Sequence, residues 1–217
     1  MKTIRTVLWA PGELFRRIGS RPTWKLVFFS VVAGNVLLNW LKSCLRGSSL
    51  VIDLGFISGS FVSISVILLA LWSMLSLFLY FFSVLINAQK RFRFKIAFSL
   101  VSHCGPIFLV EECVNFILLR LGTLKSTSLM LPNRFPVGLD LFLIGKSASI
   151  SLVVLLHSIN PFTVWYFATM ALGLTMLGGI GRRKALVEVI SAWALGVGFA
   201  LLLIFVIGGT SIGIQTR

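Results

Sequence analysis

The segment NPFTVWYFATMALGLTMLGGIG, residues 160–181, constrains the fold more than any other part of this chain. It holds no charged residue, and from Phe162 to Ile180 it is long enough to cross a hydrocarbon layer of about 30 Å as a helix. The basic tripeptide Arg182–Lys184 follows at once, and a second apolar run begins at Leu186. Two apolar runs joined by a short basic loop are typical of a multi-pass membrane protein.

The composition agrees with this class. The chain is 57% hydrophobic and 12% charged, whereas a soluble domain holds about 25% charged residues. It carries 20 Lys and Arg against 6 Asp and Glu, for a formal charge of +14. These basic residues lie in short loops beside apolar runs, where they contact anionic lipid headgroups. We therefore predict an all-α membrane bundle and expect no nucleic-acid partner.

Hydropathy predicts five membrane-spanning helices within a membrane domain of residues 26–217. They cover residues 25–45, 61–86, 96–119, 162–180 and 186–207. In the basic N-terminus, residues 1–25, the stretch Pro11–Ser20 predicts an amphipathic helix that lies in the headgroup layer or packs as an elbow before the first span. Residues 137–159 are apolar but interrupted by Lys146, so we expect a re-entrant or interfacial helix there.

The distribution of basic residues decides between five spans and six. With five, 13 Lys and Arg lie on one side of the membrane and 7 on the other; with six, the division is 11 to 9. The positive-inside rule therefore favours five spans, with the N-terminus in the cytoplasm and the C-terminus outside. On the cytoplasmic side we expect a lipid-binding face. Its residues are Arg16, Arg17, Arg21, Lys90, Arg91, Arg93, Lys95, Arg182, Arg183 and Lys184.

The third predicted span, SHCGPIFLVEECVNFILLR, holds two carboxylates. Charged groups in the hydrocarbon region are expensive and often functional. Glu111 and Glu112 are adjacent, so they are turned about 100° apart on a helix, and Pro106 should kink it. The candidate intramembrane polar site comprises Glu111, Glu112, His103, Asn115, Asn35 and Asn39.

Two interpretations of this site remain open. In the functional one, a buried carboxyl binds and releases a proton. In the structural one, one Glu bonds to Asn35 or Asn39 and the other reaches the interface near Arg120.

Motifs for catalysis are weak. His157 and Ser158 are neighbours in sequence only, and no GxSxG, HExxH or metal-spaced Cys/His set occurs. We expect no catalytic, cofactor or metal site. Cys44, Cys104 and Cys113 show no CxxC spacing, so we expect packed thiols rather than disulfides.

Several short patterns resemble the Yip family (Ypt/Rab-interacting proteins), in its compact bacterial form. In the N-terminus WAPGELFRRIGSRPTWK the matching residues are Pro11, Phe15, Arg21, Pro22 and Trp24. In the third span they are Gly105 and Pro106. The C-terminal half matches best, through Asn160, Phe162, Trp165, Gly173, Gly179, Lys184, Ala185 and Trp193.

The resemblance implies a five-span bundle with a cytoplasmic N-terminus in the bacterial inner membrane. Eukaryotic members are associated with Rab-type GTPases through a longer N-terminal region and an Asp-[Leu/Phe]-[Trp/Tyr]-Gly-Pro motif. This chain lacks that motif, so Rab binding is not expected of it. Glu111 and Glu112 are not part of the family pattern.

We therefore expect a non-enzymatic membrane protein that organises lipid, other membrane proteins or copies of itself. The rival hypothesis is a small transporter or proton-coupled permease that uses Glu111 or Glu112. Its polar path would pass His103 toward the Ser-rich second span.

Overall fold

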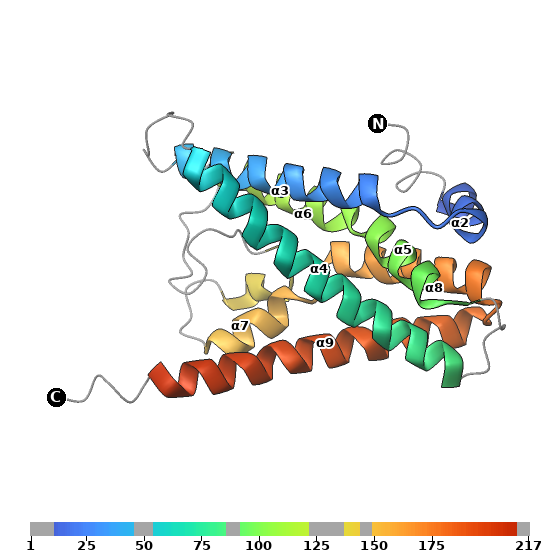
Figure 1. Ribbon diagram of the computed structural model, residues 1–217. Helices are drawn as coiled ribbons and strands as arrows, with labels where there is room; N and C mark the ends of the chain where they lie inside the picture. Colours follow the sequence, from blue (N-terminus) through green and yellow to red (C-terminus); the bar gives the residue numbers. More distant parts are fainter. Residues whose placement is uncertain (1–10, 46–53, 86–91, 122–136, 144–148, 212–217) are drawn as a thin grey trace.

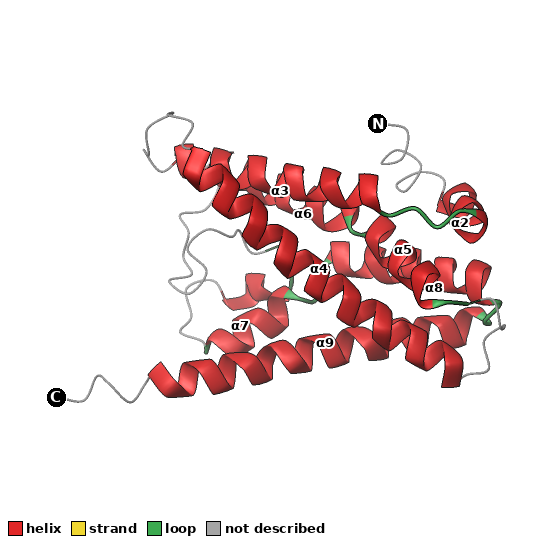
Figure 2. Cartoon of the chain, in the orientation of Figure 1, coloured by secondary structure: helices red, strands yellow, loops and turns green. Residues whose placement is uncertain are grey.

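The computed structural model describes residues 11–45, 54–85, 92–121, 137–143 and 149–211, and all regular structure in these ranges is helical (Figure 2). Three helices among the described residues are long and apolar enough to cross a membrane. They are Lys25–Cys44, Ile57–Leu85 and Pro161–Gly178. The chain is therefore a helical membrane protein, as its composition predicts.

Helix α2 covers Pro11–Ser20, the bounds expected for the amphipathic helix. Leu14, Phe15 and Ile18 form its buried face, while Arg16 and Arg17 are exposed. The buried face packs against α8, where a Cβ on Gly173 would lie 3.2 Å from Phe15 Cζ. The apolar face of α2 therefore packs against the bundle, as the elbow interpretation expects. The basic face is exposed and can contact lipid headgroups.

Helix α3 spans Lys25–Leu45, as expected, and α4 spans Leu54–Leu85. The candidate span within α4 begins at Ile57, four residues before the predicted start of the second span at residue 61, and the helix itself begins at Leu54. Gly55 and Gly59 weaken the helical pattern in the sequence. Backbone groups in an apolar medium must nevertheless be satisfied within the segment, so the helix continues through them. Val62, Val66 and Ile67 on α4 are all more than half exposed, as expected of side chains that face lipid.

The third predicted span is divided into α5, Phe94–Cys104, and α6, Pro106–Leu121. Gly105 separates them and donates its N–H to the carbonyls of Val101 and Ser102, at 3.1 and 3.2 Å. Pro106 has no N–H to continue the ladder, so the helix is interrupted where the sequence predicts a kink. A Cβ on Gly105 would lie 2.5 Å from Trp72 Cζ2, so only glycine admits this close approach of α4.

Residues 137–159 do not form a full span within the described ranges. They contain a 3-10 turn, η1, at Leu139–Leu143 and a short helix, α7, at Ile150–His157. With 8 residues, α7 extends about 12 Å, less than half of the hydrocarbon thickness. Lys146, which interrupts this segment in the sequence, lies outside the described residues.

Helix α8 covers Pro161–Gly178 and α9 covers Arg182–Ser211. They pack against each other and are joined by a tight turn in which Gly179 adopts a left-handed φ of 64°. Figure 1 shows that α2, the C-terminal ends of α4 and α8 and the N-terminal ends of α5 and α9 share one end of the bundle. Helix α7 and η1 lie toward the opposite end.

Candidate functional site

A hydrogen-bonded connection links α6 to the start of α8. The Asn160 side chain donates from Nδ2 to Glu111 Oε1 at 2.9 Å and to the His157 carbonyl at 3.0 Å. Its Oδ1 accepts from the Thr163 N–H at 2.8 Å, which makes Asn160 the N-cap of α8, with Pro161 in the first turn. Asn at the cap followed by Pro is a preferred helix start. The same side chain therefore begins α8 and fixes Glu111.

His157 lies between two carboxylates. Its Nδ1 is 2.8 Å from Asp140 Oδ2, and its Nε2 is 3.9 Å from Glu111 Oε1. All three residues are buried, each with a relative residue exposure of 8% or less. We call the set Asp140, His157, Glu111, Asn160 and Thr163 the polar cluster.

Backbone contacts place Asp140 opposite His157. The Gly138 N–H donates to Asp140 Oδ1 at 2.9 Å, and the Leu139 N–H donates to the Ile159 carbonyl at 3.1 Å. A Cβ on Gly138 would lie 2.7 Å from that same carbonyl, so glycine is needed where η1 crosses the end of α7. The fold thus aligns a carboxylate, an imidazole and a carboxylate from three separate elements.

This arrangement is suited to moving a proton. An imidazole has two ring nitrogens, either of which can carry a proton. Nδ1 of His157 is within hydrogen-bond distance of Asp140, whereas Nε2 is 3.9 Å from Glu111, longer than a hydrogen bond, so the ring lies between the two carboxylates. Among the described residues, no group of three or more His, Cys, Asp or Glu could hold a metal ion.

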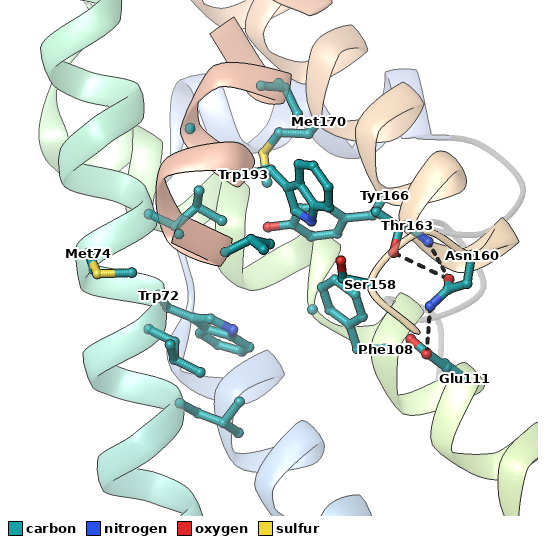
Figure 3. A pocket seen from close by; sticks show the side chains of 18 of the residues that line it. Trp72, Met74, Phe108, Glu111, Ser158, Asn160, Thr163, Tyr166, Met170 and Trp193 are labelled. Carbon is teal, nitrogen blue, oxygen red and sulfur yellow. Dashed lines mark hydrogen bonds between the residues drawn. The ribbon is translucent and has the colours of Figure 1, made fainter. Parts of the chain in front are cut away.

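The polar cluster opens onto a cavity of about 590 Å³ between α3, α4, α6, α7, α8 and α9. Glu111, His157, Asn160 and Thr163 belong to its lining. The rest of the lining is mostly apolar and aromatic, and Figure 3 shows Tyr166 and Trp193 beside one another and Trp72 on the opposite side of the cavity from Asn160 and Glu111. The cavity is therefore an apolar chamber with one polar wall.

The two adjacent acids diverge as the helical geometry predicts, but Glu111 does not have the expected partner. It accepts a hydrogen bond from Asn160 rather than from Asn35 or Asn39. Glu112 forms an ion pair with Lys42 on α3, at 2.5 Å. Helices α6 and α3 pack side by side, which brings Lys42 within reach.

The other predicted polar residues are held elsewhere. Asn35 donates to the Val31 carbonyl of its own helix, although it also lines the cavity. Asn39 is exposed, and Asn115 is buried on α6. His103 Nδ1 lies 2.7 Å from the Ser99 carbonyl one turn back, and His103 is not among the described lining residues. His103 is therefore not part of the wall that Glu111 shares with this cavity.

Glu188 is a buried carboxyl that the sequence interpretation overlooked. It lies on α9 with 2% exposure and accepts a hydrogen bond from Ser83 of α4. Its second oxygen, Oε2, is buried without a hydrogen-bond partner in the part of the chain that the structure describes. The signal was a lone acid in the first turn of the apolar fifth run.

Basic side chains gather at the end of the bundle that holds α2. The described and exposed members of the predicted lipid-binding face are Arg16, Arg17, Arg21, Arg93, Lys95, Arg182, Arg183 and Lys184. They come from α2 and from the beginnings of α5 and α9, which share that end in Figure 1. Lys90 and Arg91 lie outside the described residues.

The Yip-pattern residues mainly support the packing. Phe15 and Gly173 meet between α2 and α8, Asn160 caps α8, and Trp193 stacks edge-on with Phe167. The others lie on or beside the described helices: Pro11, Arg21, Pro22, Trp24, Gly105, Pro106, Phe162, Trp165, Gly179, Lys184 and Ala185. Comparisons of the chain with protein-family models, with curated proteins and with solved structures give no match.

Proposed function

We propose that this chain is a small proton-coupled permease with five membrane spans, located in a bacterial cytoplasmic membrane. The observation that carries this proposal is the row Asp140–His157–Glu111, buried in the bundle and ending at a cavity. Buried ionisable groups inside a membrane protein are expensive, and they mark proton relays and substrate sites. A bundle sealed around Glu111 would have favoured a purely structural role instead.

Five spans follow if α5 with α6, and α9, are added to the three clear candidates. With only Gly105 between them, α5 and α6 cover residues 94–121, roughly 42 Å of helix. Helix α9, with 30 residues, reaches roughly 45 Å. Both lengths exceed the hydrocarbon thickness of about 30 Å. The gathering of basic residues at the α2 end supports a cytoplasmic N-terminus, and the Yip resemblance implies the same arrangement.

The interruption between α7 and α8 supports transport as well. Discontinuous helices in transporters place helix ends and freed backbone groups at a binding site near the middle of the membrane. Here the start of α8 presents Asn160 and Thr163 to the cavity, and the end of α7 presents His157.

The test is proton flux into liposomes that hold the purified full chain, driven by a pH gradient with the membrane potential clamped. We expect flux above that of empty liposomes, and Glu111→Gln should abolish it because the row loses its cavity-side carboxylate. Glu13→Gln is the matched control, since Glu13 is exposed on α2 and far from the cavity lining. Equal flux in protein-containing and empty liposomes would overturn the permease proposal.

A second candidate function is the organisation of anionic lipid, together with other membrane proteins or copies of this chain. The observation that favours it is the basic end described above. Each basic residue near a membrane surface contributes about 1 kcal/mol to the binding of anionic lipid. Changing Arg182, Arg183 and Lys184 together to Gln should weaken phosphatidylglycerol binding to the purified protein, whereas Arg120→Gln, on α6 at the other end, should not. If the triple variant bound phosphatidylglycerol as well as the wild type does, these basic residues would only orient the helices in the membrane.

A further inference from the structure

Three hydrogen-bond donors reach the cavity without an acceptor in the part of the chain that the structure describes. They are the Tyr166 hydroxyl on α8 and the indole N–H groups of Trp72 on α4 and Trp193 on α9, and all three side chains line the cavity. Tyr166 and Trp72 are only 5% and 6% exposed. Buried polar groups are nearly always hydrogen-bonded, because an unpaired one loses its bond to water and gains none in return. These donors therefore call for an acceptor that the described chain does not supply.

The donors are open to the cavity rather than enclosed by packing. The unpartnered side-chain atoms that packing does enclose, among the described residues, are Ser65 Oγ and Glu188 Oε2. Figure 3 shows the Tyr166 hydroxyl directed away from α8 into the cavity, and Trp72 extending into it from α4. A molecule inside the cavity can therefore reach these groups.

We propose that the cavity binds an uncharged lipophilic molecule with a carbonyl oxygen, which accepts hydrogen bonds from the Tyr166 hydroxyl and from an indole N–H. This inference rests on the proposed function, because it names the substrate class of the same cavity. An indole N–H only donates, so the ligand must supply the acceptor. A carbonyl oxygen has two lone pairs and no proton, so it serves two donors and adds no unpaired donor of its own.

The rings that carry these donors are each held by another ring. Trp72 lies edge-on to Phe28 with centroids 5.6 Å apart, and Trp193 lies edge-on to Phe167 at 5.5 Å. The Tyr166 ring is 4.7 Å from that of Phe108, which also lines the cavity. Donors fixed in this way are organised before the ligand arrives, which lowers the entropy lost on binding.

The lining around the donors selects an apolar, uncharged body. Leu68 and Leu75 lie about one turn before and after Trp72, so they share its face of α4, and Met170 lies one turn after Tyr166 on α8. Beside such side chains a charged group would lose its hydration without compensation, and water would lack the several polar partners that it needs. The volume of about 590 Å³ lies within the range of roughly 300–1,000 Å³ that is usual for small-molecule sites.

The ligand has a route from the bilayer. Leu71 lines the cavity and is also 50% exposed on α4. The cavity therefore reaches the outer surface of the bundle at α4, and a lipophilic molecule dissolved in the membrane can enter from the side.

The test is equilibrium dialysis of radiolabelled benzophenone against the detergent-purified full chain, with binding to protein-free micelles subtracted. Diphenylmethane is the matched probe, since it has the same two rings but no carbonyl oxygen. We expect benzophenone to bind about fivefold more tightly or better, as two hydrogen bonds would give. Equal binding of the two probes would overturn the assignment of a carbonyl ligand, and so would absent binding of benzophenone.

Variants test the donors one at a time. Tyr166→Phe keeps the ring and removes the hydroxyl, so benzophenone should bind about threefold more weakly or worse, with diphenylmethane unaffected. Tyr80→Phe is the matched control, because Tyr80 is the other tyrosine of the chain and lies outside the described lining. The Tyr166 hydroxyl has no partner within the described ranges, so its removal should leave the protein folded.

Trp72→Phe provides an independent test, because it removes an indole N–H and keeps an aromatic ring. It should also weaken benzophenone binding severalfold, with Trp40→Phe as the control outside the described lining. Unchanged benzophenone affinity in both Tyr166→Phe and Trp72→Phe would overturn the site.

The two proposals fail in different ways. Proton flux without benzophenone binding would leave the permease and remove the substrate class. Benzophenone binding without proton flux would leave the site and remove the coupling to protons.

Discussion

Glu111 and Glu188 are both buried carboxyls in an apolar bundle, yet their surroundings differ in kind. Glu111 faces an amide that also caps a helix, an imidazole supported by a second carboxylate, and a cavity. Within the described ranges, Glu188 has a single hydrogen bond, from Ser83, and it lies where α4 and α9 pack against each other. The first is a site assembled from four elements, whereas the second is a polar side chain confined to one helix contact. A buried charge therefore indicates function only together with what the fold builds around it.

The largest effect on stability is expected from Glu111→Leu, which tests whether the polar cluster depends on its carboxylate. The variant leaves the buried Asn160 amide without its Glu111 acceptor and removes the carboxylate that lies 3.9 Å from the His157 imidazole, so the free energy of unfolding should fall by about 2–3 kcal/mol. Reversible unfolding in mixed micelles measures it. Glu111→Gln retains an acceptor and should lose less than half as much. Wild-type stability in the Leu variant would mean that the cluster is not built around Glu111.

At Glu188, by contrast, we expect replacement of the carboxyl to raise the free energy of unfolding. In the double variant Ser83→Ala, Glu188→Met, both polar partners become apolar groups, and such replacements are nearly neutral or stabilising. Because Oε2 of Glu188 has no hydrogen-bond partner in the described structure, we expect a gain of about 1–2 kcal/mol in the same unfolding assay. If the free energy of unfolding fell by a similar amount instead, Glu188 would have favourable polar interactions in the folded protein. The contrast between Glu188 and Glu111 would then not hold.

The same contrast shows what could be predicted from the sequence. Hydropathy and end signals placed α2 and α3 at their observed bounds and α8 within two residues at each end, because apolar length and Pro or Gly at helix ends are local properties. Pro106 likewise marked the interruption between α5 and α6. The acids Glu111 and Glu112 stood out because charge inside an apolar run is itself a local anomaly.

The partners of these acids could not be predicted in the same way. Asp140 and His157 lie 17 residues apart and meet only because η1 folds back over the end of α7. Glu111 and Asn160 are 49 residues apart and meet through the packing of α6 on α8. Asn160 was noticed as part of a family pattern, but its bond to Glu111 depends on tertiary contacts that no spacing encodes.

A smaller loss of stability is expected from Asp140→Asn, which removes the charge of a side chain in the polar cluster but keeps its shape. Asp140→Asn retains an acceptor for the Gly138 N–H but replaces a charge-assisted bond to His157 with a neutral one, so we expect a loss of about 1 kcal/mol. A double-mutant cycle with Glu111→Gln measures whether the two carboxylates are coupled through the imidazole. Strictly additive losses would show that Asp140 and Glu111 act separately, and the row would then not be a relay.

The smallest effect is expected from Glu112→Gln, the neighbour of Glu111 on the other face of α6. Its ion pair with Lys42 is partly exposed, with relative side-chain exposures of 11% and 19%, and such pairs contribute at most about 1 kcal/mol. We therefore expect a loss below 1 kcal/mol in unfolding and no change in proton flux. Lys42→Met is the matched partner variant, because it also breaks the pair but leaves the carboxylate. If Glu112→Gln lowered flux as much as Glu111→Gln, the functional acid would face α3 rather than α8. Proton movement would then not depend specifically on the polar cluster.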